Sequence, residues 1–145
     1  MHADPEPHQA EGGCLCRSVR YRITGAPLLS IICHCHSCRK ASAAPSVAWL
    51  TLDIAHLKVL SGVLRSFQSS RGVTRTFCAV CGSPITYESD RYPGTIDVTT
   101  VSLDDPGQFP PAREVWLEHK IAWEVTNETL EQFPQGSGGG TQVSS

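Results

Sequence analysis

The stretch CHCHSCRK, residues 33–40, places three cysteines, two histidines and two cations within eight residues. Its cysteines, Cys33, Cys35 and Cys38, form a C-x-C-x-x-C run that supplies three sulfurs from one short segment. Thiols spaced this closely are disulfide partners, metal ligands or nucleophiles. The other cysteines of the chain help to decide between these roles.

Four further cysteines lie in two close pairs, so none of the seven is isolated: Cys14 with Cys16, and Cys78 with Cys81. An odd number of thiols cannot all pair within one chain, and reducing compartments keep thiols free. The N-terminal residues also lack the apolar segment of an export signal. We therefore expect a cytoplasmic protein whose cysteines bind metal instead of forming a disulfide framework.

The two pairs together suit a closed four-thiolate site. Cys78 and Cys81 flank a two-residue spacer, and Gly82 after them allows the backbone to turn at positive φ so that both sulfurs face one ion. Cys14 and Cys16 are two residues apart, which puts both side chains on one face of an extended chain. The four sulfurs therefore predict a structural zinc site.

The three-cysteine run is typical of a catalytic zinc site, which has three protein ligands and an open fourth position. A competing grouping joins Cys35 and Cys38 to the Cys78/Cys81 pair as a zinc ribbon. Its intervening stretch of about forty residues exceeds the usual span of roughly 15 to 20, and it leaves three thiols unused. Iron–sulfur ligation is a further alternative, but the spacing differs from that of ferredoxins. We favour two Zn²⁺ ions per chain.

The sequence also indicates positions for the other polar residues of the stretch and for the remaining histidines and tryptophans. His34 and His36 alternate with the cysteines, so we expect their side chains to point away from the sulfurs. Arg39 and Lys40 either offset the thiolate charge or meet substrate carboxylates, or are solvated surface cations, and the sequence leaves these readings open. We expect the remaining histidines at the surface or in a tail, and the tryptophans in the core: His2, His8, His56, His119, Trp49, Trp116 and Trp123.

Outside the cysteine motifs the sequence has the pattern of β-strands. In VRYRIT, residues 19–24, apolar side chains alternate with arginines, as in a half-buried strand. The same signals, divided by turn residues, predict strands at 28–33, 46–52, 56–60, 63–68, 73–77, 84–89, 95–101 and 114–120. Only RKASA, residues 39–43, has the composition of a helical turn. We expect a mainly β fold of antiparallel sheets in a single domain.

Length and charge limit the other possibilities. A chain of 145 residues, 40% of them hydrophobic, is suited to one core, which we place at residues 11–134 between flexible tails at 1–10 and 135–145. The net charge of -2 gives no general attraction to nucleic acid or anionic lipid. No apolar run approaches the roughly 18 residues of a membrane span. We therefore expect neither nucleic acid nor membrane as a partner.

Several motifs together resemble the glutathione-dependent formaldehyde-activating enzymes, a family that also contains the centromere-protein-V-like proteins. They are GGCLCRSVRY, CHCHSCRKASAAPSVAWLTL, TRTFCAVCGSPITYES, VSLDDP and HKIAW, within residues 11–134. The resemblance implies a β-tent fold with a structural zinc on Cys14, Cys16, Cys78 and Cys81 and a catalytic zinc on Cys33, Cys35 and Cys38. One departure is Ala43, two residues before Pro45, where family members commonly carry glycine.

The resemblance also implies a chemistry for the open site. Zn²⁺ held by three thiolates accepts a fourth soft ligand such as a substrate thiolate, so we expect glutathione to be activated for addition to formaldehyde, giving S-hydroxymethylglutathione. This is the activity of a carbon–sulfur lyase. The alternative is a non-catalytic zinc module that carries glutathione or contacts a protein partner. The aldehyde and the oligomeric state stay open at this stage.

Overall fold

The structure is a computed structural model and describes residues 9–137. The expected tails therefore fall mostly outside the described residues, namely at 1–8 and 138–145. The strands are β1 (Gln9–Gly13), β2 (Arg20–Thr24), β3 (Leu29–Cys33), β4 (Val47–Asp53), β5 (Leu57–Ser61), β6 (Leu64–Ser70), β7 (Val73–Cys78), β8 (Pro84–Ser89), β9 (Thr95–Thr99), β10 (Arg113–Val115) and β11 (Glu131–Gln132). The helices are α1 (His36–Ser42) and four 3₁₀ turns, η1 (Ile54–His56), η2 (Thr100–Ser102), η3 (Pro106–Gln108) and η4 (Leu117–His119).

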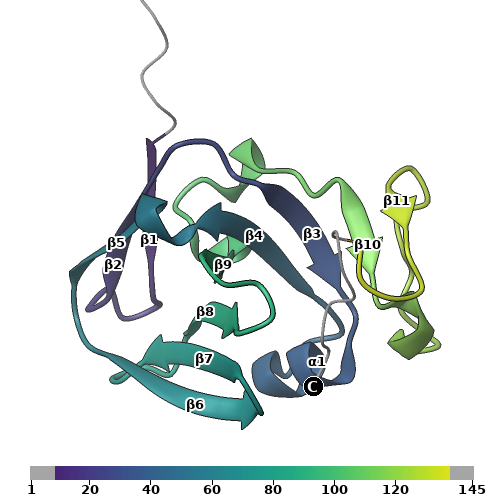
Figure 1. The fold of residues 1–145 in the computed structure, drawn as a ribbon, viewed down its shortest axis with the longest axis horizontal. Coiled ribbons are helices and arrows are strands. Elements are labelled where there is room, and N and C mark those ends of the chain that lie inside the picture. Colours follow the sequence, from purple (N-terminus) through teal and green to yellow (C-terminus); the bar gives the residue numbers. More distant parts are fainter. Residues whose placement is uncertain (1–8, 138–145) are drawn as a thin grey trace, which may run out of the picture.

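The strands form two sheets (Figure 1). A three-stranded sheet has the order β1-β2-β5, and an eight-stranded sheet has the order β11-β10-β3-β4-β9-β8-β7-β6. All pairs are antiparallel except β10 with β3 and β10 with β11, which are parallel. The mainly β fold predicted from the sequence is thus confirmed, but the larger sheet is mixed.

Two hydrophobic cores lie on the two faces of β4. Leu50 and Leu52 pack in the first core with Tyr21 of β2, whereas Trp49 packs in the second core with Ile31 of β3. Because successive side chains of a strand point to opposite faces, a strand buried on both faces has the nearly continuous apolar sequence seen at VAWLTL.

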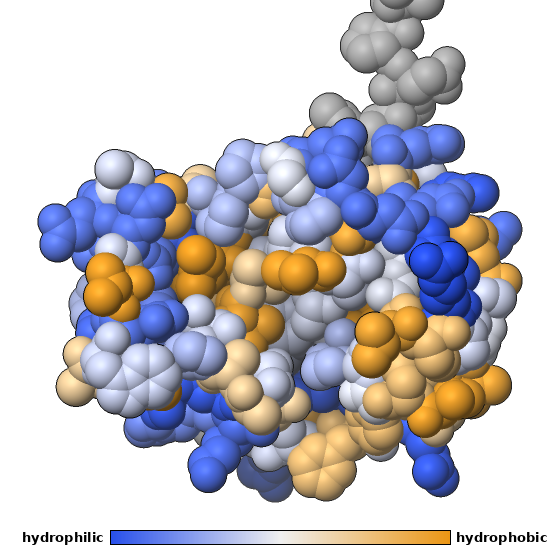
Figure 2. All heavy atoms as spheres, turned by 180° about the vertical axis from the view of Figure 1, so that it is seen from behind, coloured by the Kyte–Doolittle hydropathy of each residue, from blue (hydrophilic) through white to orange (hydrophobic). Residues whose placement is uncertain are grey.

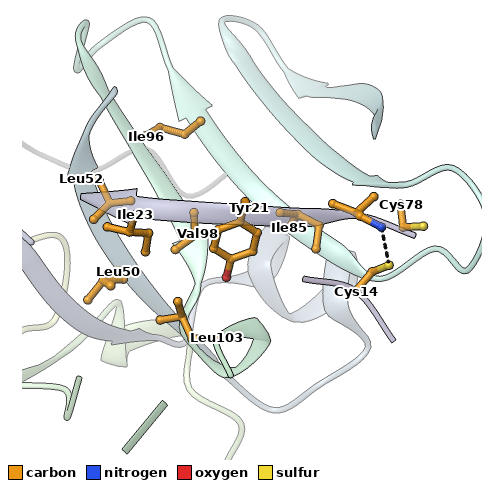
Figure 3. Close-up of a cluster of buried hydrophobic side chains, with 11 residues drawn as sticks. Cys14, Tyr21, Ile23, Leu50, Leu52, Cys78, Ile85, Ile96, Val98 and Leu103 are labelled. Atoms are coloured by element: carbon orange, nitrogen blue, oxygen red, sulfur yellow. Dashed lines mark hydrogen bonds between the residues drawn. The ribbon is translucent and has the colours of Figure 1, made fainter. Parts of the chain in front are cut away.

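Each core ends at a cysteine cluster. The first core contains Cys14 and Cys78, which lie next to each other at one end of the buried side chains in Figure 3. The second contains Cys33, Cys35 and Cys38. Each cluster is therefore attached to a hydrophobic core, although Cys16 and Cys81 of the first cluster lie in turns.

Several local expectations need correction. The strand expected at 114–120 ends at Val115, because Trp116 adopts the left-handed conformation with φ 60° and η4 follows. Trp49 and Trp116 are buried as expected, but Trp123 is 70% exposed and lies outside the core. The expected tails are also shorter, since β1 begins at Gln9 and the carbonyl of Gln135 accepts a hydrogen bond from the Trp116 amide.

The surface mixes polar and apolar groups. Figure 2 shows hydrophobic side chains in small groups among hydrophilic ones on the back of the molecule. Within residues 9–137, no helix has the length and apolar character needed to cross a membrane.

Candidate metal centres

The first centre consists of Cys14, Cys16, Cys78 and Cys81, whose Sγ atoms all lie within 4.8 Å of one another. The sulfur of Cys16 is 3.5 Å from that of Cys14 and 3.8 Å from that of Cys78. A tetrahedral zinc with Zn–S distances of about 2.3 Å separates its sulfurs by about 3.8 Å. Both the spacing and the donor type therefore fit a closed zinc site.

Local backbone geometry brings these sulfurs together. Gly82 turns at φ 80° after the Cys78/Cys81 pair, and its amide donates to the Cys78 carbonyl. The amides of Val80 and Cys81 donate to the Cys78 sulfur at 3.3 and 3.4 Å. Such a turn needs a glycine, because a side chain at this positive φ would be strained.

Glycine has a different role before Cys14. A Cβ atom at Gly13 would lie 2.1 Å from the carbonyl oxygen of Val19. The Cys14 amide donates to that same carbonyl at 3.1 Å, and the Val19 amide donates to the Cys14 sulfur at 3.2 Å. The absence of a side chain at Gly13 thus permits the close approach that closes the Cys14–Val19 turn.

Hydroxyl groups favour the thiolate forms in this centre. A hydrogen bond with Ser18 lowers the pKa of Cys78 to about 7, and one with Ser83 lowers the pKa of Cys81 to about 5. Hydrogen bonds to the charged form of an acid lower its pKa. These two sulfurs therefore favour the thiolate form, whereas the pKa of Cys16 is raised, because the lowering by Ser18 is outweighed by desolvation and by hydrogen bonds with Cys14 and Cys81.

The second centre consists of the three cysteines of the run, which are buried and whose Sγ atoms lie within 4.8 Å of one another. Cys33 ends β3, Cys35 is the N-cap of α1, and Cys38 lies in the helix with its amide donating to the Cys35 sulfur at 3.3 Å. Among residues 9–137, no fourth cysteine, histidine or carboxylate joins this group. All seven cysteines of the chain are free thiols.

The electrostatics of the second centre single out Cys38. Hydrogen bonds from Cys33 and Cys35, together with the charge of Arg75, hold the pKa of Cys38 well below its usual range. Nη1 and Nη2 of Arg75 lie 3.9 and 3.8 Å from the Cys38 sulfur. The guanidinium is fixed by a 3.0 Å hydrogen bond from Nε to Ser69 and by packing on the Tyr87 ring.

Arg75 was not identified from the sequence, which directed attention to Arg39 and Lys40. Lys40 is exposed and Arg39 is half-buried. The signal for Arg75 is its place in VTRTF, where it occupies the inward position between Val73 and Phe77. An arginine on the buried face of a strand requires a partner, and here the partner is a sulfur.

His34 and His36 lie outside the sulfur group. His34 is buried, and its Nε2 is 2.6 Å from Oε1 of Glu114, whose Oε2 accepts from the Asn127 amide at 2.6 Å. This network ties the segment between Cys33 and Cys35 to β10 and to the C-terminal loop. It thereby fixes the position of two of the three sulfurs.

His36 is exposed and forms an aromatic stack. Its ring lies 4.2 Å from that of His119, which in turn stacks on Trp116 at 5.1 Å. His119 is half-buried, so its expected place at the surface is only partly correct. His56 is half-buried as well, and His2 and His8 lie outside the described residues.

The end of α1 explains the departure at Ala43. This residue is the C-cap, with φ 51° and ψ 44°, and its amide donates to the Arg39 carbonyl. The left-handed conformation favours glycine at this position of a helix. Ala43 therefore holds this conformation under strain.

Two cavities lie next to the side chains of Arg75 and Tyr87. One, of about 260 Å³, is lined by Trp49, Phe67, Arg75 and Phe77 and by residues of α1. The other, of about 200 Å³, has Tyr87 and Asp97 in its wall. Arg75 lines the first cavity and Tyr87 lines the second, and the two residues are directly paired across β7 and β8, so the two cavities adjoin at this pair.

Comparison with known proteins places these features in a family. A family model described as glutathione-dependent formaldehyde-activating enzyme matches residues 9–119. A crystal structure of a Rhodobacter sphaeroides protein is similar in fold, with a TM-score of 0.55, 23% identity, and coverage of 65% of this chain and 87% of that one. No curated protein matches the chain.

Proposed function

The chain belongs to the family of glutathione-dependent formaldehyde-activating enzymes, and on this premise we propose that it is a zinc-dependent carbon–sulfur lyase. It adds a thiol, glutathione in the first instance, to formaldehyde or a related small aldehyde, or reverses that addition. The observation that carries the proposal is the group of three buried sulfurs within 4.8 Å, one donor short of a closed zinc site.

The seven cysteines would bind two zinc ions. Cys14, Cys16, Cys78 and Cys81 would hold a structural zinc, and Cys33, Cys35 and Cys38 a catalytic one. When bound at the second centre, Zn²⁺ would offer an open coordination position that stabilises a substrate thiolate over the thiol. A reducing compartment such as the cytoplasm would keep all of these thiols available, so cytoplasmic location is part of the proposal.

Arg75 makes the second centre more receptive to an anion. Three thiolates and one Zn²⁺ have a net charge of about -1, which opposes the approach of a further thiolate. The Arg75 guanidinium, 3.8 Å from the Cys38 sulfur and mostly buried, offsets that charge. Its effect is strong because the surroundings exclude water.

The cavity that contains Arg75 is the proposed place of glutathione. Its aromatic walls, which include Trp49 and Phe67, can pack against the peptide, and the Arg75 guanidinium is the donor for a carboxylate. Thiol and aldehyde then meet at high effective concentration. The sulfur forms a bond to the carbonyl carbon, the carbonyl π pair moves to oxygen, and a proton completes the hydroxyl of S-hydroxymethylglutathione.

The burial of the three sulfurs favours a second candidate function. A non-catalytic zinc module, which carries glutathione or contacts a protein partner, also holds its metal away from water. Only the lyase would convert the aldehyde, whereas the zinc module would bind glutathione without a reaction.

Cobalt substitution tests both. Sulfur-to-cobalt charge-transfer absorption should grow when glutathione is added to the cobalt-loaded protein, and S-methylglutathione, which has no free thiol, is the matched control. Formaldehyde should then be consumed faster than with glutathione alone. An unchanged spectrum would overturn thiol binding at the second centre, and a changed spectrum without turnover would support the carrier.

A further inference from the structure

One wall of the cavity that Asp97 lines is formed by residues paired across four neighbouring strands. Leu29 of β3 pairs with Thr51 of β4, Thr51 pairs with Asp97 of β9, and Asp97 pairs with Tyr87 of β8. Directly paired residues project to the same face of a sheet. These pairs thus place one carboxyl group, one phenol and one threonine hydroxyl beside an apolar side chain in a space of about 200 Å³.

This cavity shares a wall with the second centre. Ile31 and Tyr87 line the cavity and also belong to the core that contains the three cysteines of the run. The Tyr87 ring lies 5.0 Å from the Arg75 guanidinium carbon, and that guanidinium faces the Cys38 sulfur. The cavity therefore borders the side chains that pack around the centre.

The lining suits an uncharged, largely apolar ligand. Leu28, Leu29 and Ile31 supply its apolar wall, and no lysine or arginine of the described residues lines it. The carboxylates of glutathione would meet Asp97 without a compensating cation, which disfavours that peptide here. A cavity of about 150 Å³ can hold benzene, so the space accepts a six-membered ring.

Asp97 is the polar group of this cavity that can exchange a proton near neutrality. Burial is the main cause that raises the pKa of Asp97 to about 7. A hydrogen bond from Thr51 lowers this pKa, the charge of Cys38 on α1 raises it, and the charge of Arg75 on β7 lowers it. Tyr87 on β8 and Tyr92 are the tyrosines that line the same cavity, and burial raises the pKa of each above its ordinary range. Asp97 therefore carries a proton in part of the molecules at pH 7.

We propose that this cavity binds the aldehyde, that it selects a ring-sized apolar aldehyde, and that Asp97 donates a proton to the carbonyl oxygen. The inference rests on the proposed function and names the substrate class of the same site. As the thiol sulfur bonds to the carbonyl carbon, the C=O π pair becomes the O–H bond with the Asp97 proton. The proton lost by the thiol returns to Asp97 through solvent, so the step is balanced.

The test uses the zinc-loaded full chain with benzaldehyde, formaldehyde and the unreactive probe benzyl alcohol. Leu28 lines the cavity but is 58% exposed, so Leu28→Trp narrows the space without a cost in the core. This variant should lower kcat/KM for benzaldehyde at least tenfold, by a larger factor than that for formaldehyde, and weaken benzyl alcohol binding, measured by calorimetry, at least tenfold.

Asp97→Asn tests the proton donor. It should lower kcat at least tenfold with both aldehydes. The rate of the unmodified protein is expected to fall as pH rises above about 7, and this fall should be absent in the variant. Asp105→Asn, at an exposed acid, is the matched control and should change neither. An alkaline limb that persists in Asp97→Asn would overturn the role of Asp97.

The outcomes separate this inference from the proposed function. If benzyl alcohol fails to bind while glutathione still alters the cobalt spectrum, the aldehyde cavity is wrong and the thiol site stands. If benzyl alcohol binds and Leu28→Trp removes that binding, but neither aldehyde is turned over, the cavity is a ligand site and the lyase function is wrong.

Discussion

The guanidinium of Arg75 and the sulfur of Cys38 lie 3.8 Å apart, although 37 residues separate them in the chain. Arg75 reaches the helix from β7, where its backbone is paired with Tyr87. This contact joins the β7–β8 part of the sheet to α1. It also supplies the buried positive charge that three neighbouring thiolates require.

Replacing Arg75 should weaken metal retention at the second centre alone. Arg75→Met removes the charge while keeping an apolar stem, so the thiolates lose their compensation and zinc affinity there should fall about tenfold, or roughly 1.4 kcal/mol. Competition with a chromogenic chelator measures this. Arg75→Lys should recover part of the lost affinity. Arg91→Met, at an exposed site, is the control and should lose no zinc affinity. Equal affinity in Arg75→Met would show that the charge is unimportant.

The two centres should differ in their contribution to folding. Cys78→Ser removes a donor from the closed group, and because structural zinc binding is part of the folding free energy, the variant should be unfolded or insoluble. Cys35→Ser should stay folded and bind one zinc. Elemental analysis should give two zinc ions per chain for the unmodified protein and one for Cys35→Ser. A ratio near one in the unmodified protein would contradict two separate centres.

The sequence predicted the strands well because their signal is local. Alternation at 19–24 and the apolar run at 46–52 are the direct result of burial on one face or on both, and β2 and β4 lie there. Cysteine spacing is also local, and the sulfurs that it grouped lie together in space. The parallel pairing of β10 with β3 was missed, because register between distant segments depends on tertiary packing.

Residues around the candidate site were harder to predict. Alternation with Val73 and Phe77 indicates that Arg75 faces inward, but alternation with Ile96 and Val98 does not indicate this for Asp97. Neither pattern shows which side chains the two residues meet across the sheet. His34 was correctly separated from the sulfurs, yet its partner Glu114 is 80 residues away. Trp123 was placed in the core from residue type alone, and such a preference does not determine the position of one side chain.

Ala43→Gly should stabilise the protein. At φ 51° an alanine has a Cβ clash with the backbone that glycine avoids, and the gain should be about 1 kcal/mol. Urea unfolding of the zinc-loaded protein measures it. Ala44→Gly is the neighbouring control and should destabilise slightly, because it only increases the entropy of the unfolded chain. A loss of stability in Ala43→Gly would refute the strain at this helix end.

The buried pair of His34 and Glu114 should be a major contributor to stability. The two side chains are 1% and 2% exposed and lie 2.6 Å apart, so removing one leaves the other without its partner in the interior. Glu114→Ala also removes the acceptor of the Asn127 amide. The free energy of unfolding should fall by about 3 kcal/mol, as expected for a broken buried pair.

Glu118→Ala is the matched control for that change. Its carboxylate is 3.8 Å from His119 and largely exposed, so its loss should cost less than about 0.5 kcal/mol. Because the network holds the segment between Cys33 and Cys35, Glu114→Ala should also loosen the second centre and speed zinc release from it, while the first centre keeps its metal. Unfolding curves and metal-release rates measured on the same samples check both effects. A Glu114→Ala protein as stable as Glu118→Ala would show that the buried pair only offsets its own desolvation.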